Sequence, residues 1–148
     1  MLASATRSLA ALSDRVLLVA RHAGTFAHQE GSRYVPLEFD WDDAGFRQKL
    51  EDALARDAPI DRALLWLHQP VDILPWLLPL MANAAIVLVL GSMHGEVNSD
   101  ALPRNVVPVW LGSKRTAEGR RWLTNEEISQ GAIDALRSGR PTVVGEIE

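Results

Sequence analysis

The stretch Ala85-Ile86-Val87-Leu88-Val89-Leu90 is apolar at every position. A short run without polar alternation is typical of a strand that is covered on both faces, as in a parallel sheet. The preceding residues, 70–84, indicate a helix in which Pro70 suits the first turn and Pro79 should kink or shorten the helix. A helix that leads into such a strand predicts a crossover connection, and crossover connections predict a mostly parallel sheet.

Five further segments have the composition of strands, namely residues 15–21, 34–39, 61–68, 106–111 and 141–147. Pro36 indicates an edge position for the second of them, because proline cannot donate to a central ladder. We expect helices between most of these strands. The exceptions are a polar loop at residues 22–33, with Gly24 and Gly31 as breakers, and a long strand-to-strand loop at residues 92–105. This order of elements predicts an α/β fold.

Three other segments carry apolar residues at helical spacing. These stripes are Leu2, Ala5, Leu9 and Leu12; Phe46, Leu50, Ala53 and Leu54; and Ile128, Ala132 and Leu136. Asp42 or Asp43 is expected to cap the second helix. Thr124 and Glu127 have the spacing of a capping box at the start of the third helix, and Gly139 should stop that helix.

The bulk composition is that of one globular domain with a sizeable core, because 47% of the 148 residues are hydrophobic and 23% are charged. The formal net charge of -4 gives no overall positive field, so we expect no nucleic-acid partner. A local cluster could still hold a smaller anion; it comprises Lys114, Arg115, Arg120 and Arg121. The sequence has no cysteine, and its four histidines lack metal-ligand spacing, so we expect no metal.

The longest apolar stretch, residues 73–90, is interrupted by Pro75, Pro79 and Asn83. A membrane span needs about twenty uninterrupted apolar residues, so this stretch is expected to be core. Residues 1–13 lack the layout of a cleavable signal. We therefore expect a soluble, cytoplasmic protein without a membrane partner, and apolar residues near Trp110 and Pro141 hint at a homo-oligomer.

The order of these elements resembles the short-chain dehydrogenase/reductase family, especially its small atypical members. The stretch Arg121-Trp122-Leu123-Thr124-Asn125-Glu126-Glu127-Ile128 is similar to a recurring segment of those members. The resemblance implies a doubly wound, Rossmann-like sheet in a three-layer α/β/α arrangement, forming a single domain over residues 1–148. It also implies that a dinucleotide binds across the carboxyl ends of the strands.

The family opens with a strand and a glycine-rich turn, whereas the start of this sequence, residues 1–6, resembles the helix that follows that turn. We expect that the usual first strand is missing and that the domain is N-terminally incomplete. In the family's strand order this strand is central. A gap is therefore expected between the strands that begin near Arg15 and Asp61.

The same resemblance implies a set of cofactor-binding residues at the strand ends: Leu2, Arg21, His22, Asp40, Trp41, His68, Gln69, Gly112 and Thr116. Leu2 begins the helix that faces the pyrophosphate. Arg21 would hold the ribose phosphate, which implies NADP in preference to NAD because guanidinium pairs with phosphate in a forked contact. Asp40 and Trp41 fall on the adenine side, and Gly112 with Thr116 would hold the nicotinamide amide.

Ordinary structural roles are the alternatives for these residues. Arg21 is equally well explained as an exposed arginine that ends a strand. Asp40 could cap a helix beside a half-buried Trp41, His68 could be a hydrogen-bonded structural residue, and the loop that follows residue 111 could be a solvated basic loop.

Ser92, directly after Gly91, matches the family's catalytic serine in place and could donate a hydrogen bond to a substrate carbonyl. The family's tyrosine and lysine pair, four residues apart, is absent, since the single tyrosine, Tyr34, lies on another strand. His94 is the nearby titratable residue that could substitute, although a surface-loop histidine is the expected interpretation. The sequence predicts an NADP-binding oxidoreductase for a small carbonyl or alcohol substrate. The alternatives are a noncatalytic dinucleotide-binding sensor or subunit, and a fragment without independent function.

Overall fold

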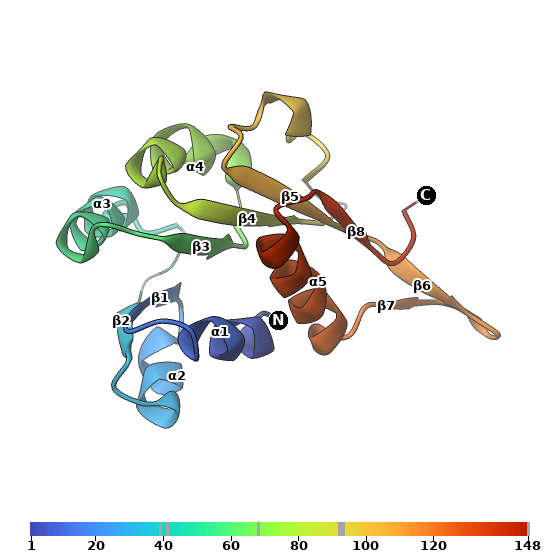
Figure 1. The fold of residues 1–148 in the computed structure, drawn as a ribbon, viewed down its shortest axis with the longest axis horizontal. Helices are drawn as coiled ribbons and strands as arrows, with labels where there is room; N and C mark the ends of the chain where they lie inside the picture. Colours follow the sequence, from blue (N-terminus) through green and yellow to red (C-terminus); the bar gives the residue numbers. More distant parts are fainter. Residues whose placement is uncertain (39, 41, 68, 92–93, 148) are drawn as a thin grey trace. The chain divides into compact units, whose positions relative to one another are not determined.

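The computed structural model describes residues 1–38, 40, 42–67, 69–91 and 94–147 (Figure 1). The chain divides into two compact units, which we call the small unit (Arg7–Ile60) and the large unit (Met1–Thr6 with Asp61–Glu148). Helix α1 (Ala3–Ala10) begins in the large unit and ends in the small one, and it confirms that a helix forms there. Leu12 was wrongly included in its apolar stripe, because this residue lies beyond the helix and is 68% exposed. The expectation of a single domain over residues 1–148 stays a prediction.

The small unit continues with four elements: β1 (Val16–Ala20), α2 (Ala23–Glu30), β2 (Tyr34–Glu38) and α3 (Phe46–Asp57). The two strands are parallel and paired along their whole length, from Val16 opposite Tyr34 to Ala20 opposite Glu38. Both predicted strands are confirmed. In the part of the chain that the structure describes, β2 pairs with β1 alone, which suits the proline at position 36.

Helix α2 corrects the polar loop that we expected at residues 22–33. Ala23 and Ala27, one helical turn apart, are buried, and the ring of Phe26 packs edge-to-face on Tyr34 with 5.4 Å between centroids. Gly31, with φ 121°, ends the helix. The apolar stripe of this helix consists of small alanines beside one aromatic residue, a pattern too weak to predict a helix from sequence.

Helix α3 buries all four residues of its predicted stripe, Phe46, Leu50, Ala53 and Leu54. Its predicted aspartate cap is wrong in detail. Gly45 is the N-cap residue, and the Oδ1 atom of Asp43 accepts a hydrogen bond from the Gly45 amide at 2.8 Å. The Asp43 carboxylate therefore stabilises the turn that enters the helix, while the Asp43 carbonyl accepts from the amide of Phe46, the first helical residue, at 3.0 Å.

The large unit contains a four-stranded parallel sheet in the order β3-β4-β5-β8. Its strands are β3 (Arg62–Leu65), β4 (Ala85–Leu90), β5 (Val106–Leu111) and β8 (Thr142–Val144). The bounds of β4 and β5 are those predicted, and β3 and β8 are shorter than predicted. The prediction of an α/β fold with a mostly parallel sheet is confirmed. Strands β1 and β3 belong to different sheets, and no ladder joins them among the described residues. The gap expected between them stays a prediction.

Strand β4 is central to this sheet, and five of its six residues are buried. The helix before it, α4 (Pro70–Leu77), gives way at Leu78 to the 3₁₀ helix η1 (Leu78–Met81). The predicted shortening near Pro79 is thereby confirmed, because proline lacks the amide that an α-helix requires. After β4 the chain runs through the short 3₁₀ helix η3 (Ser99–Ala101) to β5.

Helix α5 (Asn125–Ser138) packs against β4, β5 and β8, as Figure 1 shows. Its Ile128, Ala132 and Ala135 form one cluster with side chains of the sheet, Val87, Val89 and Val109. The capping box is confirmed, since the Thr124 hydroxyl accepts from the Glu127 amide at 3.1 Å. Gly139 ends the helix with φ 66°, a left-handed conformation that glycine adopts without strain.

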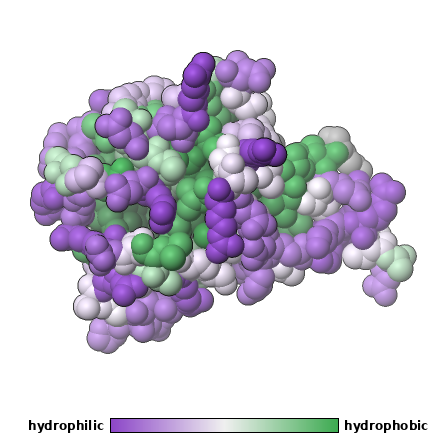
Figure 2. All heavy atoms as spheres, viewed as in Figure 1, coloured by the Kyte–Doolittle hydropathy of each residue, from purple (hydrophilic) through white to green (hydrophobic). Residues whose placement is uncertain are grey.

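Residues 113–122 form an antiparallel hairpin, which corrects the predicted loop after residue 111. Its strands are β6 (Ser113–Thr116) and β7 (Gly119–Trp122). Figure 1 shows the hairpin extending away from the parallel sheet, and Figure 2 shows that its visible surface is largely hydrophilic. Strands with so many charged residues have no apolar alternation, so the sequence lacked the usual signal for them.

The helices within the described ranges are all too short or too polar to cross a membrane.

Candidate functional site

Arg21 and His22 follow β1 directly, at the carboxyl edge of the two-stranded sheet in the small unit. Because Ala20 is paired with Glu38, Arg21 comes directly after the last pair of this sheet. Both residues are exposed. Arg21 has no hydrogen bond or ion pair with any residue that the structure describes, so its guanidinium is available to an external anion.

The first turn of α2 follows Arg21 and His22 in the chain, and one of its backbone amides already binds a carboxylate. The Gly24 amide donates to the Oε1 atom of Glu38 at 2.6 Å, and a side chain at position 24 would collide with that carboxylate. His22 is the N-cap residue of the helix, although its side chain makes no capping hydrogen bond. Free amides and the helix dipole favour an anion at this position. The edge therefore combines an exposed cation with an anion-accepting helix start.

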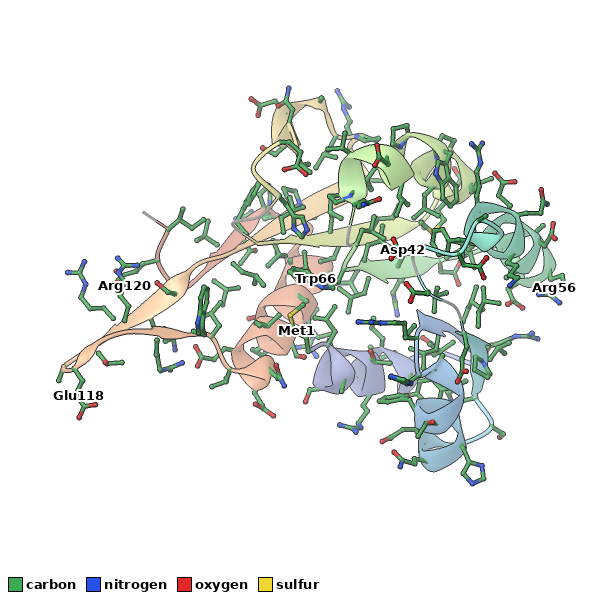
Figure 3. The ribbon with its side chains drawn as sticks, turned by 180° about the vertical axis from the view of Figure 1, so that it is seen from behind. Met1, Asp42, Arg56, Trp66, Glu118 and Arg120 are labelled. Atoms are coloured by element: carbon green, nitrogen blue, oxygen red, sulfur yellow. The ribbon has the colours of Figure 1, made fainter. Side chains whose placement is uncertain are left out.

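Asp40 lies in the segment that follows β2, and its carboxylate is used locally. The Oδ1 atom accepts from the Asp42 amide at 3.2 Å, and the Asp40 carbonyl accepts from the Asp43 amide at 3.0 Å. Figure 3 labels Asp42 in this turn. Trp41, its predicted partner on the adenine side, lies outside the described residues. The adenine contact at Asp40 stays a prediction.

A depression of about 480 Å³ between β2 and α3 is lined by Leu37, Lys49, Asp52, Ala55 and Arg56. The Lys49 ammonium pairs with the Oδ2 atom of Asp43 at 3.2 Å. None of the predicted site residues that the structure describes is among those that line the depression.

In the large unit, the carboxyl ends of the parallel strands lie along one edge. Leu65 is paired with Leu88, and Leu90 with Trp110, so Gly91 adjoins Leu111. The predicted catalytic Ser92 and the predicted cofactor residue His68 follow these strands but lie outside the described residues. Gln69 is the N-cap residue of α4, and its carbonyl accepts from the Asp72 and Ile73 amides.

His94 is buried, with 1% of its surface exposed, so the expected surface-loop histidine is wrong. Its Nδ1 atom accepts from the Gly91 amide at 3.0 Å, and its ring packs edge-to-face on Trp66 with 5.2 Å between centroids. An Nδ1 acceptor places the proton of the neutral ring on Nε2. The Nε2 atom has no partner among the described residues.

The contacts of His94 with Gly91 and Trp66, which we call the His94 cluster, were not predicted from the sequence. No local pattern indicates that a residue after β3 meets a residue after β4. Trp66 (Figure 3) follows β3, and His94 follows β4, and the two meet only through the pairing of these strands. The cluster holds Gly91, the residue before Ser92, by both its amide and its carbonyl, which accepts from the His94 amide at 3.0 Å.

Gly112 and Thr116, predicted at the nicotinamide amide, are both engaged in the hairpin and its base. The Gly112 amide donates to the Val144 carbonyl at 2.8 Å, and its α-carbon lies so close to the backbone of Glu146 that no side chain fits. The Thr116 hydroxyl donates to the Gly119 carbonyl at 3.0 Å in the hairpin turn. Their contact with a cofactor stays a prediction.

Leu2 precedes α1, and its side chain packs against the core cluster of the large unit. Its carbonyl accepts from the amide of Thr6 at 2.9 Å and from the Thr6 hydroxyl at 2.8 Å. These contacts secure the first turn of α1. The role of this turn at a pyrophosphate stays a prediction.

Among the residues that the structure describes, no three or more histidine or carboxylate side chains gather as metal ligands would. No family model matches the chain, and no curated protein or solved structure is significantly similar to it. The likeness to short-chain dehydrogenases therefore continues to rest on element order and on residues 121–128.

Glu127 joins the hairpin to the start of α5. Its carboxylate lies 2.8 Å from the Lys114 ammonium and 2.8 Å from the Arg121 guanidinium. Hydrogen bonds from Lys114, Arg121 and Thr124 outweigh its partial desolvation and lower the pKa of Glu127 from 4.5 to about 2. The ionised form is thus the one that the fold stabilises.

We predict that Glu127 makes folding stability depend on pH between about 4.5 and 2. A lowered pKa contributes stability that is present above the unfolded value and is lost as the pH falls toward the folded value. Glu127→Gln should therefore reduce the free energy of unfolding at pH 7, and its difference from the wild type should shrink below pH 4.5. Urea denaturation at several pH values measures this, with the exposed neighbour changed in Glu126→Gln as control. A difference that stays constant with pH would contradict the prediction.

Proposed function

We propose that this chain is an atypical protein of the short-chain dehydrogenase/reductase type that binds NADP(H) in preference to NAD. The observation that carries the proposal is the carboxyl edge of β1, where exposed Arg21 precedes a helix start whose Gly24 amide binds a carboxylate at 2.6 Å. The proposal includes the finer expectation of a doubly wound, three-layer Rossmann-like arrangement.

The chemistry of this edge fits a phosphate group. A guanidinium offers a forked pair of donors, and the start of a helix offers amides and a partial positive charge. The absence of a side chain at Gly24 leaves room for an anion beside its amide, and Glu38 uses that room. In this proposal Arg21 and the Gly24 amide would hold the ribose phosphate of NADP, and Glu38 competes with it for the amide.

We predict that Arg21→Ala weakens the binding of NADP⁺ by roughly tenfold or more and changes NAD⁺ binding much less, because only NADP⁺ carries the ribose phosphate. Isothermal titration calorimetry with both cofactors measures the two affinities. Arg137→Ala, which removes an exposed arginine of α5, is the matched control. The proposal fails if NADP⁺ does not bind, or if Arg21→Ala lowers both affinities equally.

The role of Glu38 gives a second prediction with the opposite sign. Glu38→Gln removes the negative charge that occupies the first turn of α2. NADP⁺ should then bind several-fold more tightly than to the wild type, whereas NAD⁺ should gain little. The same titrations test this, with Glu51→Gln as a control on α3. Weaker NADP⁺ binding in Glu38→Gln would show that the carboxylate supports the cofactor instead of competing with it.

Tyr34 favours a second candidate, a sensor or subunit that binds the dinucleotide without turning it over. This tyrosine, the single one in the sequence, begins β2 and is 7% exposed. Its burial and the neighbouring Glu30 carboxylate raise the pKa of Tyr34 above its ordinary value. It is therefore neither placed at the carboxyl edge nor tuned as a general acid.

Turnover separates the two candidates. If the chain is a reductase, NADPH should be consumed with small aldehydes and ketones, and Ser92→Ala should abolish consumption while NADPH still binds, because the serine would stabilise charge on the carbonyl oxygen. If NADPH binds tightly and no member of a broad carbonyl panel consumes it, the sensor is supported. Turnover that Ser92→Ala leaves unchanged would remove Ser92 from the mechanism.

A further inference from the structure

The β6–β7 hairpin places like charges directly opposite each other in two successive cross-strand pairs. Lys114 is paired with Arg121, and Arg115 with Arg120. Directly opposed like charges destabilise an antiparallel pair, so an anion nearby would stabilise each pair. Because side chains alternate along a strand, the two pairs face opposite sides of the hairpin.

The carboxylates beside the two pairs differ in the lengths of their contacts. Lys114 and Arg121 both contact the Glu127 carboxylate at 2.8 Å. Arg115 and Arg120 share the Glu146 carboxylate at 3.9 and 3.7 Å, and the Glu146 side chain is 57% exposed. The Glu146 carboxylate thus makes longer contacts than the Glu127 carboxylate, at a surface that an external anion can reach.

An aromatic side chain lies on the same side of the hairpin as this second pair. Trp122 is two residues from Arg120 on β7, and residues two apart on a strand share a face. It is 84% exposed. Ser113, opposite Trp122, accepts a hydrogen bond from the Arg120 guanidinium at 2.7 Å. Figure 3 shows Arg120 on the hairpin and Glu118 at its turn.

Protection of the strand edge explains part of this arrangement. Charged side chains on exposed strands discourage pairing with other chains, which accounts for the arginines. The same explanation fails for Trp122, because an exposed indole on such a strand adds apolar surface that favours association with other molecules. Two guanidiniums around a displaceable carboxylate, with an indole beside them, match a ligand that has both a phosphate group and an aromatic ring.

We propose that the face formed by Arg115, Arg120 and Trp122 binds a nucleoside monophosphate. The two guanidiniums hold the phosphate in the place of the Glu146 carboxylate, and the indole stacks on the base. This proposal uses none of the residues that carry the NADP proposal, and it does not depend on that function. The net charge of -4 disfavours a long nucleic acid but not a single nucleotide.

Calorimetric titration of the whole chain with AMP and with inorganic phosphate at low ionic strength tests this site. The wild type should bind AMP more tightly than phosphate. Arg115→Gln/Arg120→Gln should weaken AMP binding roughly tenfold or more, because it removes charge-assisted hydrogen bonds. Trp122→Ala should abolish the preference for AMP over phosphate. Arg137→Gln/Arg140→Gln removes the same charge from exposed positions elsewhere and should leave both affinities unchanged.

Glu146→Gln gives the counter-test. Its backbone bonds to Ser113 are kept, so the hairpin should stay folded, and AMP should bind several-fold more tightly because the competing carboxylate charge is gone. Circular dichroism and thermal melting check that each variant is folded. The proposal is overturned if AMP does not bind at millimolar concentration, if Arg137→Gln/Arg140→Gln weakens binding as much as the hairpin variant, or if Glu146→Gln has no effect or weakens binding.

Discussion

The burial of β4 is the constraint on which the large unit depends. Five of its six side chains are buried, and its backbone is paired with β3 on one side and β5 on the other. An apolar strand of this kind is stable only when helices cover it, and α5 supplies one cover through Ile128, Ala132 and Ala135. The parallel direction of the strands follows, and it brings their carboxyl ends to one edge.

Polar groups lie at the carboxyl edge of this sheet and at the carboxyl edge of the small unit's sheet, because the buried strands have few polar side chains. His94 and Trp66 meet behind Gly91 in the large unit, while Arg21 and the first turn of α2 meet in the small one. In both places a backbone amide donates to a side chain, from Gly91 to the nearby His94 and from Gly24 to Glu38 on the next strand. Such amides are strong donors, and they determine which side chains can be accommodated there.

Charged contacts, and not apolar packing, hold the β6–β7 hairpin against the rest of the large unit. No residue of the two hairpin strands is buried, and the strands carry four cations against one anion at the turn, Glu118. Glu127 connects it to the capped start of α5, because its carboxylate contacts two cations of the hairpin while its amide donates to the Thr124 hydroxyl. Glu146 has a similar position on the other face but makes longer contacts.

Periodicity in the sequence was sufficient to predict the helices and strands whose stabilising contacts repeat at regular intervals along the chain. Strands β4 and β5 have the predicted bounds, and the stripe of α3 is buried. Helix α5 is capped by Thr124 and Gly139 as predicted, because apolar spacing and capping act within a few residues. Tertiary structure decided the rest. Helix α2 depends on packing of small alanines, the hairpin on charges that meet across two strands, and the burial of His94 on the pairing of β3 with β4. Contacts between residues distant in sequence leave no local pattern, so only the folded chain reveals them.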